Sequence, residues 1–298
     1  MSNKQTVLVT GSSSGFGRLT VEALAKQGHT VFAAMRGIRA KNEAAARELT
    51  EQAKRDGVKI HVIELDVGDD ASVRAGIEKA LSLEGRIDVA VNNAGVMASG
   101  HDEAFTDEQI RAVFDTNVFG VQRVTRAVLP HMRQRGSGLL VFVSSNMAQI
   151  TFPFAGLYTA TKRAVEGFAE SYRYQLAPLG VDVAIVQPGG FPTDLFSKMQ
   201  VPAETNRVKE YGPLADAPQK IFGGFAESLK SANAPDPRDV ANALVKLIET
   251  PAGQRPLRTV VDHHSGQGVT AINDAVSAVQ KAVFTNFGLQ DMLSVKPR

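Results

Sequence analysis

The sequence of 298 residues contains no cysteine. This excludes disulfide bonds, cysteine nucleophiles and thiolate metal sites in the chain, and agrees with the cytoplasm, which is the expected location. A strong charge bias is also missing, since 33 Lys and Arg against 31 Asp and Glu leave a net charge of only +2. Without a basic stripe or a polybasic run, we expect no nucleic-acid partner and no membrane partner, and we expect the ligands to be small molecules.

Long apolar runs are absent as well. None approaches the roughly 18 residues that would span a bilayer. At the N-terminus, Met1 to Gln5 lead directly into the apolar run Val7 to Val9, so we expect no cleaved leader. The sequence shows neither internal repeats nor low-complexity segments. With a hydrophobic content of 43%, its length favours one large domain spanning 1–298.

What the sequence does contain is an alternation of short β-branched runs with longer segments of helical period. This pattern predicts an α/β fold with a Rossmann-like, doubly wound, mainly parallel sheet of seven strands and helices on both faces. Ligands of such sheets bind at the carboxyl ends of the strands. We expect strands near 6–10, 30–35, 59–66, 89–92, 138–144, 182–187 and 258–262, and helices near 16–27, 40–56, 71–83, 107–134, 156–177 and 239–250.

A glycine-rich turn lies between the first strand and the first helix. Gly11 permits a tight turn, and Gly15 and Gly17 let the backbone and the helix approach closely. The free amides at the helix start attract a pyrophosphate, and the hydroxyls of Ser12–Ser14 add donors. A Gly/Ser turn can also connect a strand to a helix without any ligand, so the turn alone leaves both interpretations open.

The end of the second strand bears on the choice of cofactor. Arg36 stands where an acidic residue would bind the adenosine ribose hydroxyls, and an arginine pairs with a 2′-phosphate instead. We therefore favour NADP(H), with Arg18 and Arg39 as possible assistants. If the Arg36 side chain is only solvated at the end of the strand and binds no 2′-phosphate, we expect NAD(H) as the cofactor instead. Asp66, at the end of the third strand, is placed to accept from the adenine amino group.

Tyr158 and Lys162 are four residues apart on a predicted helix, so both side chains lie on one face. An ammonium group at that position is expected to lower the pKa of the phenol. The alternative is a partly exposed helix face with an extended lysine. Earlier in the chain, Asn117 interrupts an apolar stretch of the long helix 107–134, where asparagine is a poor helix former and needs a polar partner or a buried water.

These motifs, in this order, resemble those of the short-chain dehydrogenase/reductase family over roughly Thr6 to Thr193. The resemblance implies that Ser145, thirteen residues before Tyr158, binds the substrate oxygen, that Tyr158 is the acid/base, and that Lys162 lowers its pKa and holds the nicotinamide ribose. It also implies that Asn117 anchors a water. The implied cofactor contacts are Gly11, Ser13, Ser14, Gly15, Phe16, Gly17, Arg36, Asp66, Val67, Asn93, Ala94, Gly95, Tyr158, Lys162, Pro188, Gly189 and Thr193.

The resemblance further implies hydride transfer without a metal, and a homodimer or homotetramer assembled through the fourth and fifth helices. Two other readings remain open. The first is a sensor that binds the dinucleotide without chemistry. The second is an isomerase or dehydratase of nucleotide sugars, although the chain leaves no length for the larger substrate domain that such enzymes have.

The substrate side departs from the family pattern. Bulky residues follow Ser145, and in this family the segment 190–237 forms a lid over the substrate. Its aromatic content predicts a hydrophobic ketone, aldehyde or secondary alcohol, unless these rings only form the core of the lid. The residues concerned are Asn146, Met147, Phe152, Pro153, Phe154, Phe191, Phe196, Met199, Tyr211, Phe222 and Phe225.

Beyond the seventh strand, the extension 263–298 carries an apolar seam at helical spacing. We expect this seam to pack on its own domain, with a subunit contact as the alternative. The adjacent His263 and His264 point to opposite faces of a strand, so we interpret them as structural and not as metal ligands. The seam comprises Val269, Ile272, Val276, Val279 and Val283.

Overall fold

The computed structural model describes residues 4–296, and its centre is one parallel sheet of seven strands in the order β3-β2-β1-β4-β5-β6-β7. The reversal of strand order on either side of β1 places a crevice at the carboxyl ends of β1 and β4. The strands are β1 Thr6–Thr10, β2 Thr30–Met35, β3 Ile60–Glu64, β4 Val89–Asn92, β5 Gly138–Val143, β6 Val181–Pro188 and β7 Arg258–Val261.

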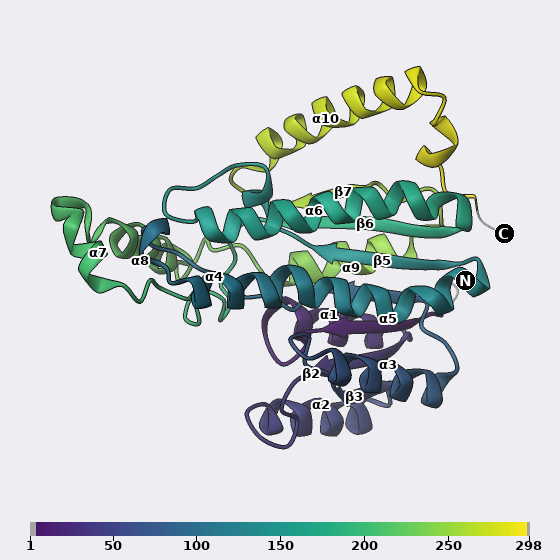
Figure 1. Ribbon diagram of the computed structural model, residues 1–298. Coiled ribbons are helices and arrows are strands. Elements are labelled where there is room, and N and C mark those ends of the chain that lie inside the picture. The colour runs from purple at the N-terminus through teal and green to yellow at the C-terminus, as the bar shows by residue number, and fades with distance from the viewer. Residues whose placement is uncertain (1–3, 297–298) are drawn as a thin grey trace.

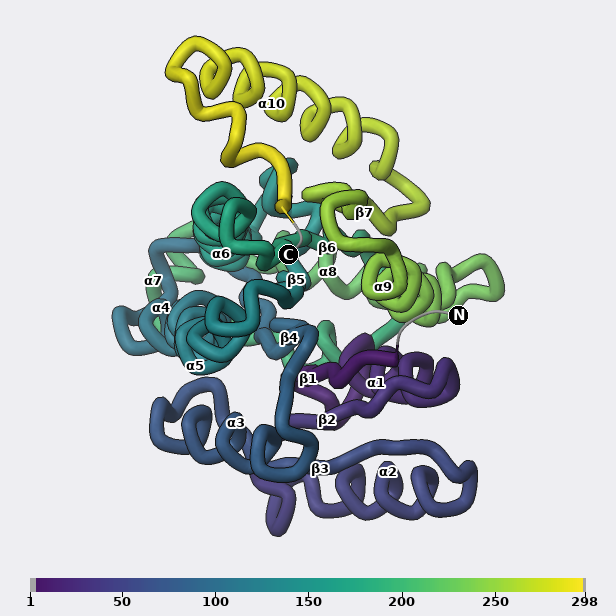
Figure 2. The backbone as a smooth tube through the Cα atoms, turned by 90° about the vertical axis from the view of Figure 1, so that its right-hand side faces the viewer, coloured from purple at the N-terminus to yellow at the C-terminus, as the bar shows by residue number. Residues whose placement is uncertain are grey.

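Helices cover both faces of the sheet, as Figure 2 shows with α3, α5 and α6 on one side and α1, α2 and α9 on the other. Each face has its own apolar core, one around Phe32 and Phe142 and the other around Leu24 and Leu49. The helices are α1 Gly15–Lys26, α2 Glu43–Asp56, α3 Asp70–Glu84, α4 Asp107–Phe114, α5 Gly120–Arg135, α6 Gly156–Leu176, α7 Thr205–Glu210, α8 Ala217–Ser228, α9 Arg238–Glu249 and α10 Gly266–Asn286.

The predicted fold class is confirmed, and all six strand pairings are parallel. Several elements differ from their predicted bounds, and the largest difference is in the fourth helix. The helix expected over 107–134 is divided into α4 and α5 by a π-helical segment, Asp115–Phe119 (η2). The division falls at Asn117, whose side chain bonds to groups outside the helix. A π segment accommodates such a residue at the cost of regular hydrogen bonding.

The segment 190–237 carries α7 and α8 and projects beyond the carboxyl ends of the strands (Figure 1). Its role as a lid stays a prediction, as does the single-domain assignment. A stacked pair formed by His101 and Tyr211, with ring centroids 3.8 Å apart, joins this segment to the loop after β4. The Tyr211 hydroxyl also donates to Glu103 over 2.7 Å.

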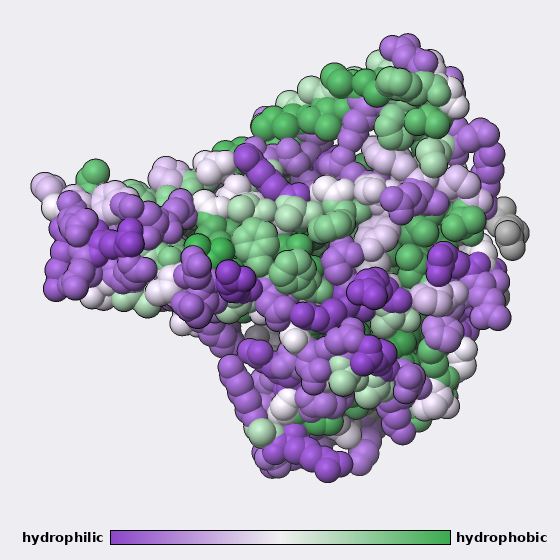
Figure 3. All heavy atoms as spheres, in the orientation of Figure 1, coloured by the Kyte–Doolittle hydropathy of each residue, from purple (hydrophilic) through white to green (hydrophobic). Residues whose placement is uncertain are grey.

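The C-terminal helix α10 stands apart from the layers in Figures 1 and 2. The expectation that its apolar seam packs on the domain is wrong for most of the seam, because only Val269 is buried and Val279 is 64% exposed. Figure 3 shows apolar side chains along the surface of this helix. Inward contacts instead come from Asn273, Gln280 and Phe284. Residues 297–298 of the predicted extension lie outside the described part of the chain.

Within residues 4–296, no helix combines the length and the apolar character needed to cross a membrane.

Candidate functional site

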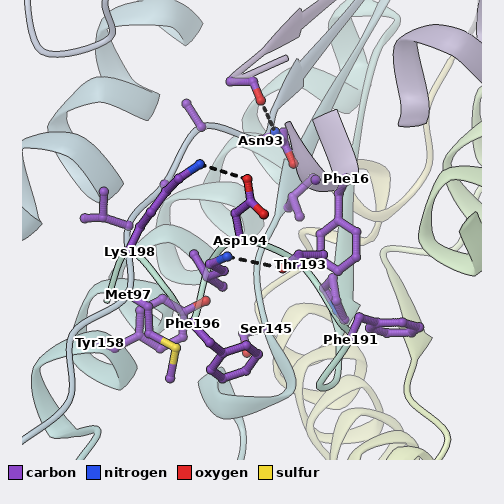
Figure 4. A pocket seen from close by; sticks show the side chains of 18 of the residues that line it. Phe16, Asn93, Met97, Ser145, Tyr158, Phe191, Thr193, Asp194, Phe196 and Lys198 are labelled. Carbon is purple, nitrogen blue, oxygen red and sulfur yellow. Dashed lines mark hydrogen bonds and ion pairs between the residues drawn. The ribbon is translucent and has the colours of Figure 1, made fainter. Parts of the chain in front are cut away.

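A pocket of about 540 Å³ lies at the carboxyl ends of the strands. It collects residues from the glycine turn, from the ends of β2 to β6, from α6 and from the segment after β6. Figure 4 looks into it: Tyr158, Met97, Phe196 and Ser145 lie together on one side, and Phe16 and Asn93 lie on the other. Chain segments that are far apart in sequence thus meet around one cavity.

The glycine turn forms one wall of the pocket through Gly11, Ser13, Ser14, Gly15 and Phe16. The side chain of Ser12 is turned away, since its hydroxyl donates to the carbonyl of Ala34, so the expected third hydroxyl donor is missing from the pocket. The start of α1 at Gly15 directs free backbone amides at this wall. This arrangement fits an anionic phosphate group.

Gly17 does not line the pocket but allows the turn to close. A Cβ atom at Gly17 would lie 2.3 Å from the carbonyl oxygen of Gly11 and 2.6 Å from Nδ2 of Asn93. Gly11 itself has a φ of +67°, and a Cβ there would lie 2.8 Å from Cα of Ala94. The glycines are therefore required by the close approach of the turn to the end of β4.

The end of β4 supplies Asn93, Ala94 and Gly95 to the pocket. The Asn93 amide group donates to the carbonyl of Thr10 over 2.9 Å and to that of Gly11 over 3.2 Å. In return, the hydroxyl of Thr10 accepts from the backbone amides of Asn93 and Ala94. These hydrogen bonds tie the end of β1 to the end of β4 and hold two walls of the pocket together.

The ends of β2 and β3 contribute Arg36, Asp66 and Val67. The Arg36 side chain is 55% exposed, and its nearest carboxylate oxygen, in Asp66, is 3.8 Å away. The expected assistant Arg18 is not in this wall, because it pairs with Glu22 and Glu48. Arg39 does not line the pocket either.

Lys41 joins this wall as a second cation, together with Asn42. Lys41 is not among the predicted cofactor residues, because it lies in the segment expected to be helical, whereas α2 begins only at Glu43. A loop at 37–42 lets this lysine turn toward the end of β2. In the sequence, only the short separation between Lys41 and Arg36 indicates that the two cations could lie in the same wall of the pocket.

Ser145, Tyr158 and Lys162 converge at the other end of the pocket, and all three are buried. Ser145 follows β5, and its hydroxyl oxygen accepts from the backbone amide of Met147 over 3.1 Å. Tyr158 and Lys162 lie one turn apart on α6. The ammonium nitrogen is 5.7 Å from the centre of the phenol ring and donates to the carbonyl of Val143 over 2.9 Å.

Burial dominates the protonation of this pair. It raises the pKa of Tyr158 to about 12, against the effect of the hydrogen bond with Ser145. It also lowers the pKa of Lys162 to about 8, and the negative charge of Glu166 opposes that shift. The predicted depression of the phenol pKa is therefore wrong for this structure. The physical reason is that desolvation of the phenolate outweighs the lysine, whose ammonium group is directed at Val143.

Asn117 lies behind Gly95 and is fully enclosed by the protein. Its side chain accepts from the amide of Val96 over 2.8 Å, and it donates to the carbonyl of Val96 and to the hydroxyl of Thr161. The polar partners expected for Asn117 are therefore protein groups, in Val96 and Thr161. Asn117 does not line the pocket, although its neighbour Thr116 does.

The end of β6 and the segment after it close the pocket with Pro188, Gly189 and Thr193. Asp262, which the sequence analysis did not single out, packs against Gly189 so closely that a Cβ there would lie 2.4 Å from its carboxyl carbon. Asp262 also accepts from Asn146 over 2.9 Å. His264 lines the pocket, whereas His263 pairs with Asp239 over 2.8 Å. Among residues 4–296, no three His, Asp or Glu side chains are grouped as metal ligands.

The bulky residues near Ser145 and in the lid segment divide into two groups. Five of the aromatic residues line the pocket, whereas Pro153, Phe154, Met199 and Tyr211 do not. Met97, Met147, Ile150 and Leu195 add to the apolar wall. The rings that line the pocket are therefore distinct from those that pack elsewhere, and the hydrophobic substrate stays a prediction. The aromatic residues in the wall are Phe152, Phe191, Phe196, Phe222 and Phe225.

A family model described as short chain dehydrogenase matches residues 5–203. The chain belongs to this family. It is an oxidoreductase that acts on CH–OH and C=O groups, and the family fold binds a nicotinamide dinucleotide. The glycine turn and the amides at the start of α1 fit such a ligand.

Two curated relatives and one solved structure illustrate the similarity. The 3-ketodihydrosphingosine reductase of Bacteroides thetaiotaomicron is 33% identical over 249 residues, which cover 82% of this chain and 83% of that protein. Retinol dehydrogenase 8 of Bos taurus is 34% identical over 268 residues, with 85% and 80% covered. A short-chain dehydrogenase from Streptomyces avermitilis superposes with a TM-score of 0.75 at 33% identity, covering 96% of this chain and 98% of that one.

Proposed function

We propose that this oxidoreductase prefers NADP(H) and exchanges a hydride with a hydrophobic ketone, aldehyde or secondary alcohol, with Tyr158 as the acid/base. The observation that carries the proposal is the convergence of Ser145, Tyr158 and Lys162 beside an apolar wall in the pocket that the glycine turn also lines. The names of the two curated relatives, a reductase of a keto compound and a dehydrogenase of an alcohol, support both directions of this reaction.

In the reducing direction, a nicotinamide held by the glycine turn, by Lys162 and by the residues at the end of β6 would supply a hydride for the carbonyl carbon. The Tyr158 hydroxyl then donates its proton to the substrate oxygen as negative charge develops there. A pKa of about 12 keeps this phenol protonated at neutral pH, as an acid must be. The Ser145 hydroxyl donates a hydrogen bond to the same oxygen, and Lys162 stabilises the tyrosinate that remains.

Loss of the phenol hydroxyl tests the chemistry. In Tyr158→Phe, we expect carbonyl reduction to fall at least about a hundredfold, because the proton donor is gone, while NADPH affinity stays within about twofold. The measurement combines steady-state kinetics on a bulky aromatic ketone with a fluorescence titration of NADPH. A variant that retains turnover within about tenfold of the parent would remove Tyr158 from this role.

The cofactor preference rests on the two cations at the end of β2. Arg36 is exposed, and Lys41 lines the same wall, so both are available to a 2′-phosphate. The alternative is an NAD-dependent alcohol dehydrogenase in which these cations are only solvated.

A side-by-side fluorescence titration with NADPH and NADH decides between the two cofactors. We expect NADPH to bind at least about tenfold more tightly, and the difference to collapse in Arg36→Ala and shrink in Lys41→Ala, because each removes one positive charge. Arg18→Ala is the matched control, since Arg18 is held by Glu22 and Glu48. Equal or tighter binding of NADH to the parent protein would contradict the preference.

The segment 190–237 is proposed as the lid over the substrate, with Phe196, Phe222 and Phe225 facing the pocket.

A cytoplasmic homodimer or homotetramer, assembled through the outer faces of α5 and α6, is proposed from the family resemblance. Light scattering on the purified chain measures that state.

A further inference from the structure

The catalytic helix α6 carries a ladder of ionisable side chains that continues past the catalytic pair. Tyr158, Lys162, Glu166 and Glu170 follow one another at steps of four residues, so they lie on one face of the helix. The first three are buried, and Glu166 is only 3% exposed. A buried carboxylate one turn beyond a buried ammonium group is costly to form unless each stabilises the other or has other partners.

Donors from three other elements surround the Glu166 carboxylate. Gln149, in the loop after β5, donates to it over 3.0 Å, and Gln187 of β6 donates over 2.8 Å. Arg258 of β7 donates over 3.1 Å. The orientation of Gln187 is set by Asn273 of α10, which donates to its carbonyl oxygen over 2.7 Å, so the amide nitrogen must face Glu166. All of these groups act as donors to the two oxygens of Glu166.

The surroundings of Lys162 contain few other charges. The end of β5 presents the carbonyl of Val143, and the π-helical segment presents the neutral amide of Asn117 near Gly95. Asp115 of that segment is paired with Arg123 over 2.6 Å. On α6 itself, the titratable neighbours are Tyr158 and Glu166, and Glu166 is the charged group that acts on Lys162.

The charge of Arg258 is shared between two acids. Its side chain pairs with Glu166 and also with Glu170, which in turn accepts from Gln280 of α10. Two carboxylates therefore face one guanidinium group, and the negative charge left over lies on the face of α6 that carries Lys162.

On this geometry, we propose that Glu166 is a positioning residue that keeps Lys162 in its ammonium form beneath Tyr158, and that β6, β7 and α10 hold its carboxylate in place. The inference rests on the proposed role of Lys162 in the function above. It extends the site along α6 from the pocket to the contact with the C-terminal helix.

The test follows the protonation of Lys162 directly. The full chain is labelled with ¹³C at the lysine ε-carbons, the Lys162 signal is assigned by its loss in Lys162→Arg, and its titration is followed by NMR. In Glu166→Gln we expect the midpoint to fall by about one pH unit, because a charge one helical turn away is removed from a poorly solvated site. Glu166→Asp keeps the charge and is expected to restore the parental midpoint to within about 0.3 pH unit.

Glu170→Gln is the matched control, since Glu170 shares Arg258 but lies one turn farther from Lys162. It is expected to move the midpoint by less than about 0.3 pH unit. If Glu166→Gln does not fold, Arg258→Gln is compared with the double variant Glu166→Gln/Arg258→Gln, in which no guanidinium group is left unpaired. The double variant should then have the lower midpoint.

An unchanged Lys162 midpoint in Glu166→Gln, or an equal shift in Glu170→Gln, overturns the proposal. In the double-variant comparison, equal midpoints do the same. Because the titration needs neither cofactor nor substrate, its outcome is independent of the Tyr158→Phe kinetics that test the proposed function. A failure of one is thus distinguishable from a failure of the other.

Discussion

At the scale of single residues, the site keeps ionisable groups where water is largely excluded. Lys162 is 6% exposed, and burial lowers its pKa to about 8. A folded-state pKa below the ordinary value of 10.5 means that folding disfavours the protonated form. The cost to stability is absent above about pH 10.5 and complete below about pH 8.

Replacement of this lysine by a neutral side chain of similar length should therefore stabilise the fold while removing activity. For Lys162→Met we expect a gain of about 2 kcal/mol at pH 7, since about 3 kcal/mol of desolvation is relieved and about 1 kcal/mol is lost with the hydrogen bond to Val143. Urea unfolding at pH 7 and pH 10 measures this gain, which should shrink at the higher pH. Turnover and cofactor affinity should both fall.

The exposed Lys79 provides the control for a general effect of adding methionine. Lys79→Met should leave the unfolding midpoint unchanged at both pH values. A loss of stability in Lys162→Met at pH 7, or a gain that is equally large at pH 10, would show that burial of the charge is not the cause.

At the scale of elements, the pocket depends on how closely the glycine turn and the start of α1 approach the end of β4. The backbone of Gly11 and the side chain of Asn93 occupy the space where a Cβ of Gly17 would lie. The strand-end hydrogen bonds of Asn93 depend on the same approach. Local backbone geometry therefore determines the shape of the pocket wall that the glycine turn forms.

A single methyl group at Gly17 should disturb both the turn and the pocket wall. We expect Gly17→Ala to destabilise the protein by about 2 kcal/mol, because the new Cβ overlaps backbone atoms, and to weaken NADPH binding at least about tenfold. Thermal unfolding and fluorescence titration report the two effects. Gly167→Ala is the control: this glycine lies within α6 with no atom within 4 Å of a new Cβ, so the change should stabilise the helix by up to about 1 kcal/mol. Equal behaviour of the two variants would contradict the packing argument.

At the scale of the whole molecule, a buried ion cluster joins α6 to the far edge of the sheet. Asp182 of β6 is fully buried and pairs with Arg173 of α6 and with Arg255 before β7. Its oxygens also accept from the backbone amides of Val183 and Gly253. The cluster lies at the opposite end of β6 from the pocket, so its role is to hold these elements together.

Removal of the shared negative charge should weaken the whole fold and not the chemistry. In Asp182→Asn, two buried guanidinium groups lose their partner, and we expect a loss of about 3 kcal/mol or more in unfolding free energy. Chemical denaturation measures it, with the exposed Asp70 and Arg74 pair as the control in Asp70→Asn, which should leave the midpoint in place. A midpoint that is unchanged in Asp182→Asn would contradict a structural role of the cluster.

The sequence by itself determined the fold class and the approximate bounds of the seven strands. Strands such as Thr6–Thr10 and Val89–Asn92 were predicted at their observed bounds, since the apolar period and the flanking turn residues are local properties of the chain. The spacing of Tyr158 and Lys162 was informative for the same reason, because a helix converts it directly into a shared face, whereas Ser145 follows β5 and meets the pair only through the fold.

Only the tertiary structure decided which charges meet and which apolar residues are covered. Lys41 and not Arg18 faces the pocket, burial reverses the expected pKa shift of Tyr158, and the seam of α10 stays largely exposed. The carboxylate of Glu166 acquires its donors from β6, β7 and the loop after β5. The pairing of charged side chains and their removal from water depend on segments that are distant in sequence. A local sequence pattern therefore does not predict them.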